Sequence, residues 1–306
     1  MRVRLAVLVG AVLSALAAAT AALAITNGVP DAGRHPYVGL MVAIGDVTLP
    51  SGEVVENVPL WRCSGSLISP TVFLTAGHCT EPPAEHVEIW MAEGPILTDP
   101  DYLAAVQADP DGFVSCDASA AFDGYPCVGD AGGTPHPHPD FCIGCGPGLP
   151  GFAFRDVGVV DLDESVTVSR YAELPEAGAV DELPNKTPAD FVGYGVQVQL
   201  QIPGSQLPQP PPFYRWAGPR QRMYAPTEIV SGNFKHGEEF IRFALNPGGG
   251  SGGTCFGDSG GPDLLGGTDV VLAVNSYVTN VNCRGVGYGS RVDVPEVLSF
   301  IESFLD

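Results

Sequence analysis

Basic residues are scarce in this chain of 306 residues, where 14 Lys and Arg stand against 35 Asp and Glu and give a formal net charge of −21. A strongly acidic surface repels polyanions, so we expect no nucleic-acid partner and no anionic membrane partner. Charged residues make up only 16% of the chain, whereas glycine (39) and proline (29) are abundant. This composition favours many short strands joined by turns.

Long apolar runs are also lacking after residue 24, so no later stretch approaches the roughly 20 apolar residues that span a bilayer. Residues 1–24 themselves resemble a secretory signal peptide: Arg2 and Arg4 precede an apolar run, and Ala22-Leu23-Ala24 ends it with small residues. An uncleaved membrane anchor is the alternative. We expect cleavage and a secreted, extracellular protein that has no membrane contact after signal removal.

Eight cysteines in an exported chain predict disulfides. Sequence alone leaves three connectivities for the middle four, and we favour Cys116–Cys127 and Cys142–Cys145 because each pair closes a short local loop.

The most informative stretch is Cys255-Phe256-Gly257-Asp258-Ser259-Gly260-Gly261-Pro262. Its glycines permit a tight turn. Such a turn can aim the N–H groups of Gly257 and Ser259 at one point, where a carbonyl oxygen that becomes an oxyanion would be held. Ser259 is thus a candidate nucleophile, and a serine needs a base and an orienting acid.

Two further motifs supply these partners. Leu74-Thr75-Ala76-Gly77-His78-Cys79 offers a base in His78, and Asp156-Val157-Gly158-Val159-Val160-Asp161-Leu162 offers an acid in Asp156. Asp161 and Asp163 are rival carboxylates. In this order the three motifs resemble the trypsin-like (chymotrypsin-fold) serine endopeptidases, in a secreted, bacterial-type member. Only the register that begins at Asp156 matches that family, with Gly158 where alanine is usual.

The resemblance implies an all-β fold of two six-stranded antiparallel β-barrels with a C-terminal helix. We expect the first barrel at about 25–168, with a cysteine-containing insertion at about 92–150, the second barrel at about 190–293 and the helix at about 294–305, where apolar residues recur at helical spacing. It also implies protein or peptide substrates, no cofactor, no metal and a monomer.

Disulfides and an activating ion pair follow from the same resemblance. Cys63 should pair with Cys79, and Cys255 with Cys283. In the family a freed N-terminal amine pairs with the aspartate before the catalytic serine, which here joins Ile25 to Asp258. Because Ala24, and no basic residue, precedes Ile25, we infer that signal cleavage itself creates the activating amine. In the alternative, Ile25 merely begins the first strand.

The insertion allows other interpretations. His136 and His138 followed by Cys142 and Cys145 suggest zinc, and Asp109-Pro110-Asp111-Gly112 suggests calcium only weakly. We prefer a disulfide-pinned surface insertion that borders the substrate cleft.

Substrate preference is read from the expected pocket residues of the family. Gly253 stands at the floor, where trypsin-like members carry an acid, and Val278 narrows the wall. We therefore expect small or medium apolar side chains and not Arg/Lys specificity, although Asp263 replaces a usual apolar residue and places a charge near the pocket. The remaining expected substrate-binding residues are Thr254, Ser276, Tyr277 and Gly287, of which Ser276 would also help to hold Asp156.

Two other functions remain open. One is a non-catalytic homologue that binds a partner through the same fold, and the other is an esterase that uses the same triad.

Overall fold

The computed structural model describes residues 25, 28–109, 112–118, 122–145, 153–196, 198–201, 214–217, 219–232, 235–246, 249–280 and 282–305. The expected signal peptide, residues 1–24, lies outside these ranges, as does the proline-rich stretch 203–212. Within the described part of the chain, no helix has the length and apolar character needed to cross a membrane.

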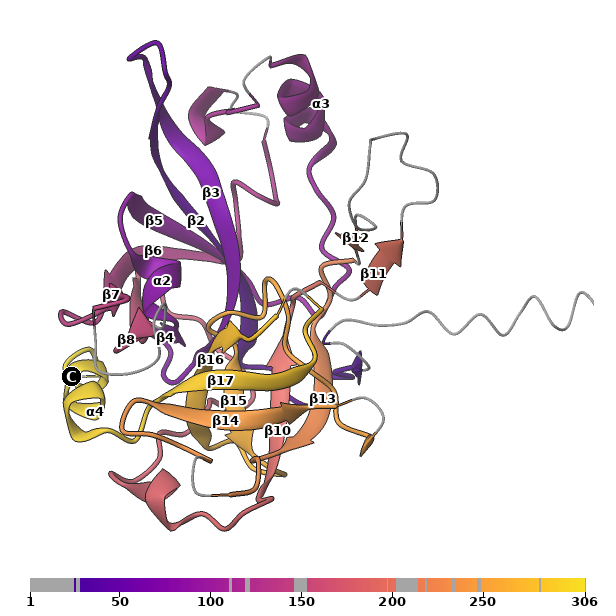
Figure 1. Cartoon of the computed structure of the whole chain (residues 1–306). Coiled ribbons are helices and arrows are strands. Elements are labelled where there is room, and N and C mark those ends of the chain that lie inside the picture. Colours follow the sequence, from indigo (N-terminus) through magenta and orange to yellow (C-terminus); the bar gives the residue numbers. More distant parts are fainter. Residues whose placement is uncertain are drawn as a thin grey trace, which may run out of the picture.

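A closed six-stranded antiparallel barrel forms the first half of the molecule (Figure 1). Its long hairpin carries the apolar run Val38–Ile44, which is buried throughout because both faces of this segment are covered. In barrel order the strands are β2 (Val38–Thr48), β3 (Val54–Leu67), β4 (Val72–Thr75), β9 (Gly158–Leu162), β6 (Ala131–Pro137) and β5 (Ala84–Trp90).

A seven-stranded antiparallel sheet forms the second half. It curls until Ile229, the residue after β13, bridges Phe243 of β14 at the other edge. The second predicted barrel is therefore a curled half-barrel. The segment after β13 and strand β14 meet at this bridge. Its strands are β1 (Val29–Pro30), β13 (Met223–Glu228), β10 (Pro188–Gly193), β15 (Pro262–Leu265), β16 (Val271–Val278), β17 (Gly285–Arg291) and β14 (Phe240–Leu245).

Helices are short and peripheral. The C-terminal helix α4 (Pro295–Glu302) buries Val297, Leu298 and Ile301, as the apolar spacing predicted. The all-β fold class with a C-terminal helix is thus confirmed. The other short elements are α2 (Gly77–Thr80), α3 (Pro100–Ala108), η2 (Cys116–Ala118), η3 (Ala179–Glu182) and the two-stranded sheets β7 (Cys142–Ile143) with β8 (Ala153–Phe154) and β11 (Val198–Gln201) with β12 (Tyr214–Ala217).

A buried ionic network joins the two halves. Arg222, beside β13, donates to the carboxylate of Asp31 at 3.1 Å and to the backbone carbonyl of Val38 in β2 at 2.9 Å. Asp31 also accepts from His35, whose Nδ1 lies 2.5 Å from Oδ1. Because a charge left unpaired in the interior is strongly unfavourable, this network fixes how the halves meet. Strand β1, in the segment expected to belong to the first barrel, pairs with β13 of the second sheet.

Candidate active site

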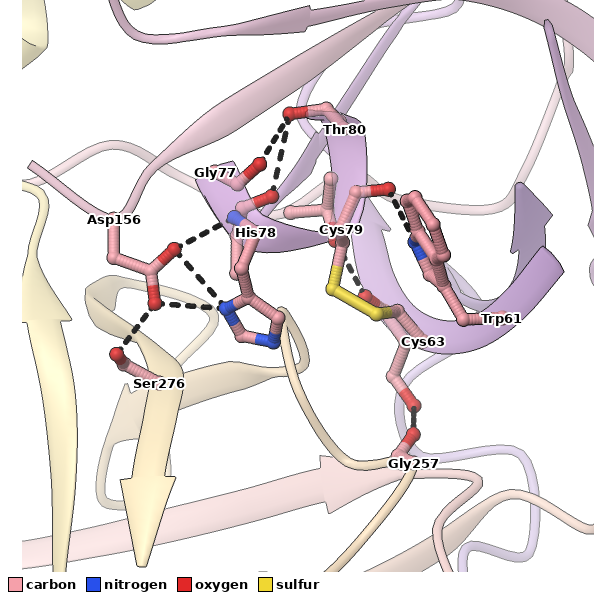
Figure 2. Close-up of a disulfide and its surroundings, with 12 residues drawn as sticks. Trp61, Cys63, Gly77, His78, Cys79, Thr80, Asp156, Gly257 and Ser276 are labelled. Atoms are coloured by element: carbon pink, nitrogen blue, oxygen red, sulfur yellow. Dashed lines mark hydrogen bonds and ion pairs between the residues drawn. A yellow bond between two sulfur atoms is a disulfide. The ribbon is translucent and has the colours of Figure 1, made fainter. Parts of the chain in front are cut away.

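His78 lies on the one-turn helix α2, directly after strand β4. Its backbone N–H donates to Asp156 Oδ1 at 2.8 Å, and its ring Nδ1 lies 2.9 Å from Asp156 Oδ2. Figure 2 shows the ring between Asp156 and the Cys63–Cys79 disulfide, which anchors α2 to β3. The contact between Nδ1 and the carboxylate leaves Nε2 as the ring nitrogen that can accept a proton.

Asp156 follows a strained turn at the start of β9. Arg155 has a φ of 50°, a left-handed conformation that is uncommon for a residue with a side chain. Gly158, where alanine was expected from the resemblance, has a local cause: a Cβ there would lie 2.3 Å from Thr80 Oγ1 and 2.8 Å from the carbonyl oxygen of Ala76. The smaller residue lets β9 approach α2 and brings Asp156 to His78.

The two groups polarise each other. Burial would raise the pKa of Asp156, but the charge of His78 and hydrogen bonds from His78 and Ser276 hold this pKa below its usual value. Burial would lower the pKa of His78, but the Asp156 charge and hydrogen bond raise it above its usual value. The Asp156 side chain is therefore ionised at neutral pH and stabilises a proton on the imidazole.

Ser276 adds a contact from the second half of the molecule. Its hydroxyl donates to Asp156 Oδ2 at 2.5 Å (Figure 2). The rival carboxylates Asp161 and Asp163 are exposed instead. The structure thus brings Asp156, and neither rival, to the histidine.

Ser259 lies in a glycine turn that abuts the histidine segment. Gly257 and Gly260 have positive φ angles of 93° and 75°, and a Cβ on Gly260 would lie 2.0 Å from Thr75 Oγ1. The Ser259 carbonyl accepts from the backbone N–H of Ser64 at 2.8 Å, which ties the turn to β3. Glycine is required here because any side chain would push the turn away from the first barrel.

Backbone donors are available at this turn. Among the described residues, the N–H groups of Gly257 and Ser259 donate to no protein acceptor. Ser64 Oγ donates to the carbonyl of Gly257 at 2.9 Å and so fixes the peptide that follows this residue. In the described chain no hydrogen bond joins Ser259 Oγ to His78, and such contacts often tighten only when substrate binds.

Asp258 is a buried carboxylate beside the nucleophile. It accepts from the backbone N–H groups of Gly195 at 2.8 Å and Cys255 at 2.9 Å, while burial raises its pKa to about 7. Ile25 is fully buried among core residues of the second sheet. Among the described residues no bond joins Ile25 to Asp258, and in the full-length chain the Ile25 nitrogen belongs to a peptide bond.

All eight cysteines are paired. The bonds are Cys63–Cys79, Cys116–Cys127, Cys142–Cys145 and Cys255–Cys283, the pairings favoured from the sequence and the resemblance. Cys142 and Cys145 therefore offer no thiolate to zinc, which removes the zinc interpretation of the insertion. The metal-capable group in the described part of the chain, Cys63, His78 and Cys79, likewise contains two oxidised cysteines.

A cavity of about 280 Å³ opens beside the His78 ring. Its lining includes Ser276 and Tyr277 of β16 and Ile143 and Ala153 of the small β7–β8 sheet. Ile143, Ala153 and Glu81 also line this cavity, although no motif in the sequence predicted them as site residues. The position of Glu81, three residues after His78, carried a usable signal, because residues i and i+3 share a face of a helical turn.

The expected substrate-binding residues lie on neighbouring segments of the second half. Tyr277 and Val278 end β16, and Val278 pairs with Gly287 of β17. Gly253 and Thr254 are buried just before Cys255. The Thr254 hydroxyl has no hydrogen-bond partner in the described structure.

Comparison with known proteins supports the predicted resemblance. Chymotrypsin-like elastase family member 3B of Macaca mulatta is 28% identical over 254 residues, which cover 80% of this chain and 79% of the relative. No protein-family model matches the chain.

Solved structures show the same fold at lower identity. HL collagenase aligns with a TM-score of 0.53 and 19% identity over 89% of this chain and 94% of that one. Human heparin binding protein aligns with a TM-score of 0.52 and 16% identity over 91% of this chain and 95% of that one. The chain therefore has the chymotrypsin-like fold and a chymotrypsin-like elastase homologue.

Proposed function

We propose that this protein is a serine endopeptidase in which Ser259 is the nucleophile, His78 the general base and Asp156 the residue that orients and charges His78. The observation that carries the proposal is the buried, ionised Asp156, which receives hydrogen bonds from His78 and from Ser276 of the opposite half. An acid held this way fixes the imidazole with Nε2 toward the cleft.

The reaction follows from these positions. Ser259 Oγ bonds to the scissile carbonyl carbon while its proton moves to His78 Nε2. The Gly257 and Ser259 N–H groups stabilise the oxyanion. His78 then gives the proton to the leaving amine as the C–N bond breaks. Water then loses a proton to His78 as its oxygen bonds to the acyl carbon, the bond between that carbon and Ser259 Oγ breaks, and His78 returns the proton to Oγ, which restores Ser259. No step in this scheme needs a cofactor.

We propose secretion and maturation by signal cleavage as well. Four disulfides are typical of oxidising compartments. The buried carboxylate of Asp258, with its raised pKa, would be stabilised by an ammonium released at Ile25. The proposed substrates are proteins or peptides with small or medium apolar side chains before the cleaved bond, which rests on Gly253 at the pocket floor and Val278 at its wall.

A non-catalytic binding role is the second candidate, and the likeness to human heparin binding protein favours it. The chain's net charge of −21 opposes a polyanionic ligand such as heparin. An esterase with the same triad is separated by comparing peptide and ester substrates that share one acyl portion.

The deciding experiment treats the secreted protein and Ser259→Ala with a fluorophosphonate probe, followed by N-terminal sequencing of the labelled species. We expect labelling of the wild type alone, with Ile25 as the first residue. Labelling with another first residue would keep the enzyme and reject the maturation route. Folded wild-type protein that takes no label would favour the binding role or an inactive precursor.

A further inference from the structure

The turn that presents Asp156 is held from both sides. Arg155, directly before the acid, has a φ of 50°, and a residue with a side chain keeps such a conformation only where the surrounding structure fixes it. The backbone N–H of Val157, directly after the acid, donates to the carbonyl of Arg155 at 2.7 Å. Asp156 is thus the central residue of a three-residue turn. Whatever holds Arg155 and Val157 sets where the Asp156 carboxylate points.

One support reaches this turn from the end of strand β6. The backbone N–H of His138, directly after β6, donates to the carbonyl of Val157 at 2.9 Å. His138 is 5% exposed, and its ring meets the ring of Phe300 in α4 with the centroids 5.0 Å apart. The residue after the acid is therefore connected to the C-terminal helix through a single buried side chain.

The other support is the side chain of Arg155 itself. Its Nη1 lies 3.5 Å from Glu239 Oε2, directly before β14 of the second half, and its Nη2 lies 3.6 Å from Glu296 Oε2 in the first turn of α4. The guanidinium also lies over the ring of Phe154, 5.3 Å from its centroid. The residue before the acid is thus joined by charge to the second half of the molecule and to the C-terminal helix.

Stability is a weak explanation for this guanidinium. The side chains of Arg155 and Glu239 are only 12% and 13% exposed, and burial raises the pKa of Glu239 although the charge of Arg155 opposes this shift. Arg155 Nε and Nη1 are buried without a hydrogen-bond partner in the described structure. Loose ion pairs of this kind do not offset the loss of water around both charges. The cost points to the geometry that Arg155 imposes on the next residue.

We propose that Arg155 is a positioning residue for the proposed peptidase, one that keeps Asp156 on His78. Its ion pairs with Glu239 and Glu296 hold the turn of the acid against β14 and α4. This inference rests on the proposed function and adds a second support to Ser276, which contacts the carboxylate itself. In the described part of the chain, the cavity beside His78 is lined by none of the three ion-pair residues. The support therefore acts on turnover and not on substrate binding.

The first test removes the side chain without straining the backbone. Glycine adopts a left-handed φ freely, so Arg155→Gly can keep the turn while it loses both ion pairs. We expect kcat for a peptide substrate to fall about 10- to 100-fold, the scale of a small displacement of a catalytic group, with little change in KM. The acid limb of the kcat profile should move to lower pH, because a displaced Asp156 favours the protonated His78 less. Arg155→Lys keeps the charge and should recover part of kcat.

A merely structural role gives a different result. If Arg155→Gly folds and keeps the kcat and the acid limb of the wild type, the inference is overturned, even if the unfolding midpoint has changed. The matched control is Arg170→Met, which breaks an ion pair of 3.0 Å with Asp269. This variant should leave kcat and the acid limb unchanged, and an equal loss in it would also contradict a specific role for Arg155.

The second test removes a partner and does not require any Arg155 variant to fold. Glu239→Gln keeps the shape of the side chain without its charge and should lower kcat in the same direction. The double variant Arg155→Gly/Glu239→Gln should lose no more than Arg155→Gly alone, because both changes remove one interaction. An unchanged kcat in Glu239→Gln, or fully additive losses in the double variant, would contradict the proposed support.

Fluorophosphonate labelling separates this inference from the proposed function. Wild-type protein that takes the label at Ser259 and cleaves peptides, with Arg155→Gly unimpaired, rejects only the role of Arg155. Folded wild-type protein that takes no label rejects the peptidase and this inference with it.

Discussion

The hydroxyl of Ser276 donates to Asp156 Oδ2 at 2.5 Å across the boundary between the two halves. Strand β16 thereby holds an acid that follows strand β8 of the first half. The proposed triad of Asp156, His78 and Ser259 keeps its arrangement only while the halves stay docked, so the buried Arg222–Asp31 pair would support the proposed chemistry.

Removing that contact should slow the enzyme without unfolding it. Ser276→Ala leaves one Asp156 oxygen with a single protein donor, and hydrogen bonds to charged groups contribute about 1.5–3 kcal/mol. We expect kcat/KM to fall roughly 10- to 100-fold, while the chain still folds with a thermal unfolding midpoint only a few degrees lower. Ser303→Ala, which removes a hydroxyl that donates to the carbonyl of Phe300 within α4, serves as the control. Equal losses in both variants would contradict a specific role for Ser276.

The pH dependence of activity should report the raised pKa of His78. Activity needs the neutral imidazole, so it should rise with pH through a midpoint above the usual histidine value, because the Asp156 charge favours the protonated ring. In Asp156→Asn that midpoint should move to lower pH, and kcat should drop roughly 10⁴-fold, because the amide no longer holds the imidazole in the tautomer that leaves Nε2 free to accept a proton. An acid limb that stays in place after the substitution would argue against Asp156 as the orienting acid.

The raised pKa of Asp258 leads to a prediction about how maturation changes the stability of the fold. Its folded pKa of about 7 exceeds the usual value of 3.8, so the unmatured fold binds the proton more tightly than the unfolded chain does. The contribution of this group is therefore most favourable at low pH and is lost as pH rises from about 4 to about 7. A chain that begins at Ile25 should escape this loss, because its ammonium pairs with the carboxylate.

The matched comparison is a chain that begins at Ala24, one residue longer. We expect the difference in unfolding midpoint between the two chains to grow as pH rises from 4 to 7. Parallel curves would show that the Ile25 amine does not reach Asp258.

The close approach at Gly158 should tolerate no side chain. In Gly158→Ala the new methyl would meet Thr80 Oγ1 and the Ala76 carbonyl, and such overpacking destabilises by about 1–3 kcal/mol. Fluorophosphonate labelling should slow as Asp156 shifts from His78. Adding Thr80→Ala removes one of the two clashes and should restore part of both losses, whereas no recovery would mean that the Ala76 carbonyl alone sets the limit.

The Cys142–Cys145 disulfide should matter for substrate and little for stability. It closes a loop of only a few residues, and short loops restrict the unfolded chain least. It also pins the turn that presents Ile143 to the cavity beside His78. Replacing both cysteines with serine should raise KM for peptides and leave the unfolding midpoint nearly unchanged. The matched variant replaces Cys63 and Cys79, which anchor α2, and should lose both stability and kcat.

The sequence by itself determined the strand-rich class and the motifs around three candidate catalytic residues. It left three connectivities for the middle four cysteines, and the pairs Cys63–Cys79 and Cys255–Cys283 were implied only by the family resemblance. The class and the motifs follow from short-range patterns: alternation in strands, glycines around Ser259, and apolar spacing in the last helix. Each such pattern lies within a few residues, so it is visible without the fold.

Only the tertiary structure decided which groups are unpaired, how far the second sheet closes and what borders the cleft. Asp263 is an ordinary acid in the sequence. In the fold its carboxylate occupies the space that a side chain at Gly289, 26 positions away, would fill. Ile143 reaches the cavity through a small sheet in the insertion, and Ile229, the residue after β13, bridges Phe243 in the edge strand β14 of the same sheet. These relations depend on packing between segments distant in sequence, which local pattern cannot encode.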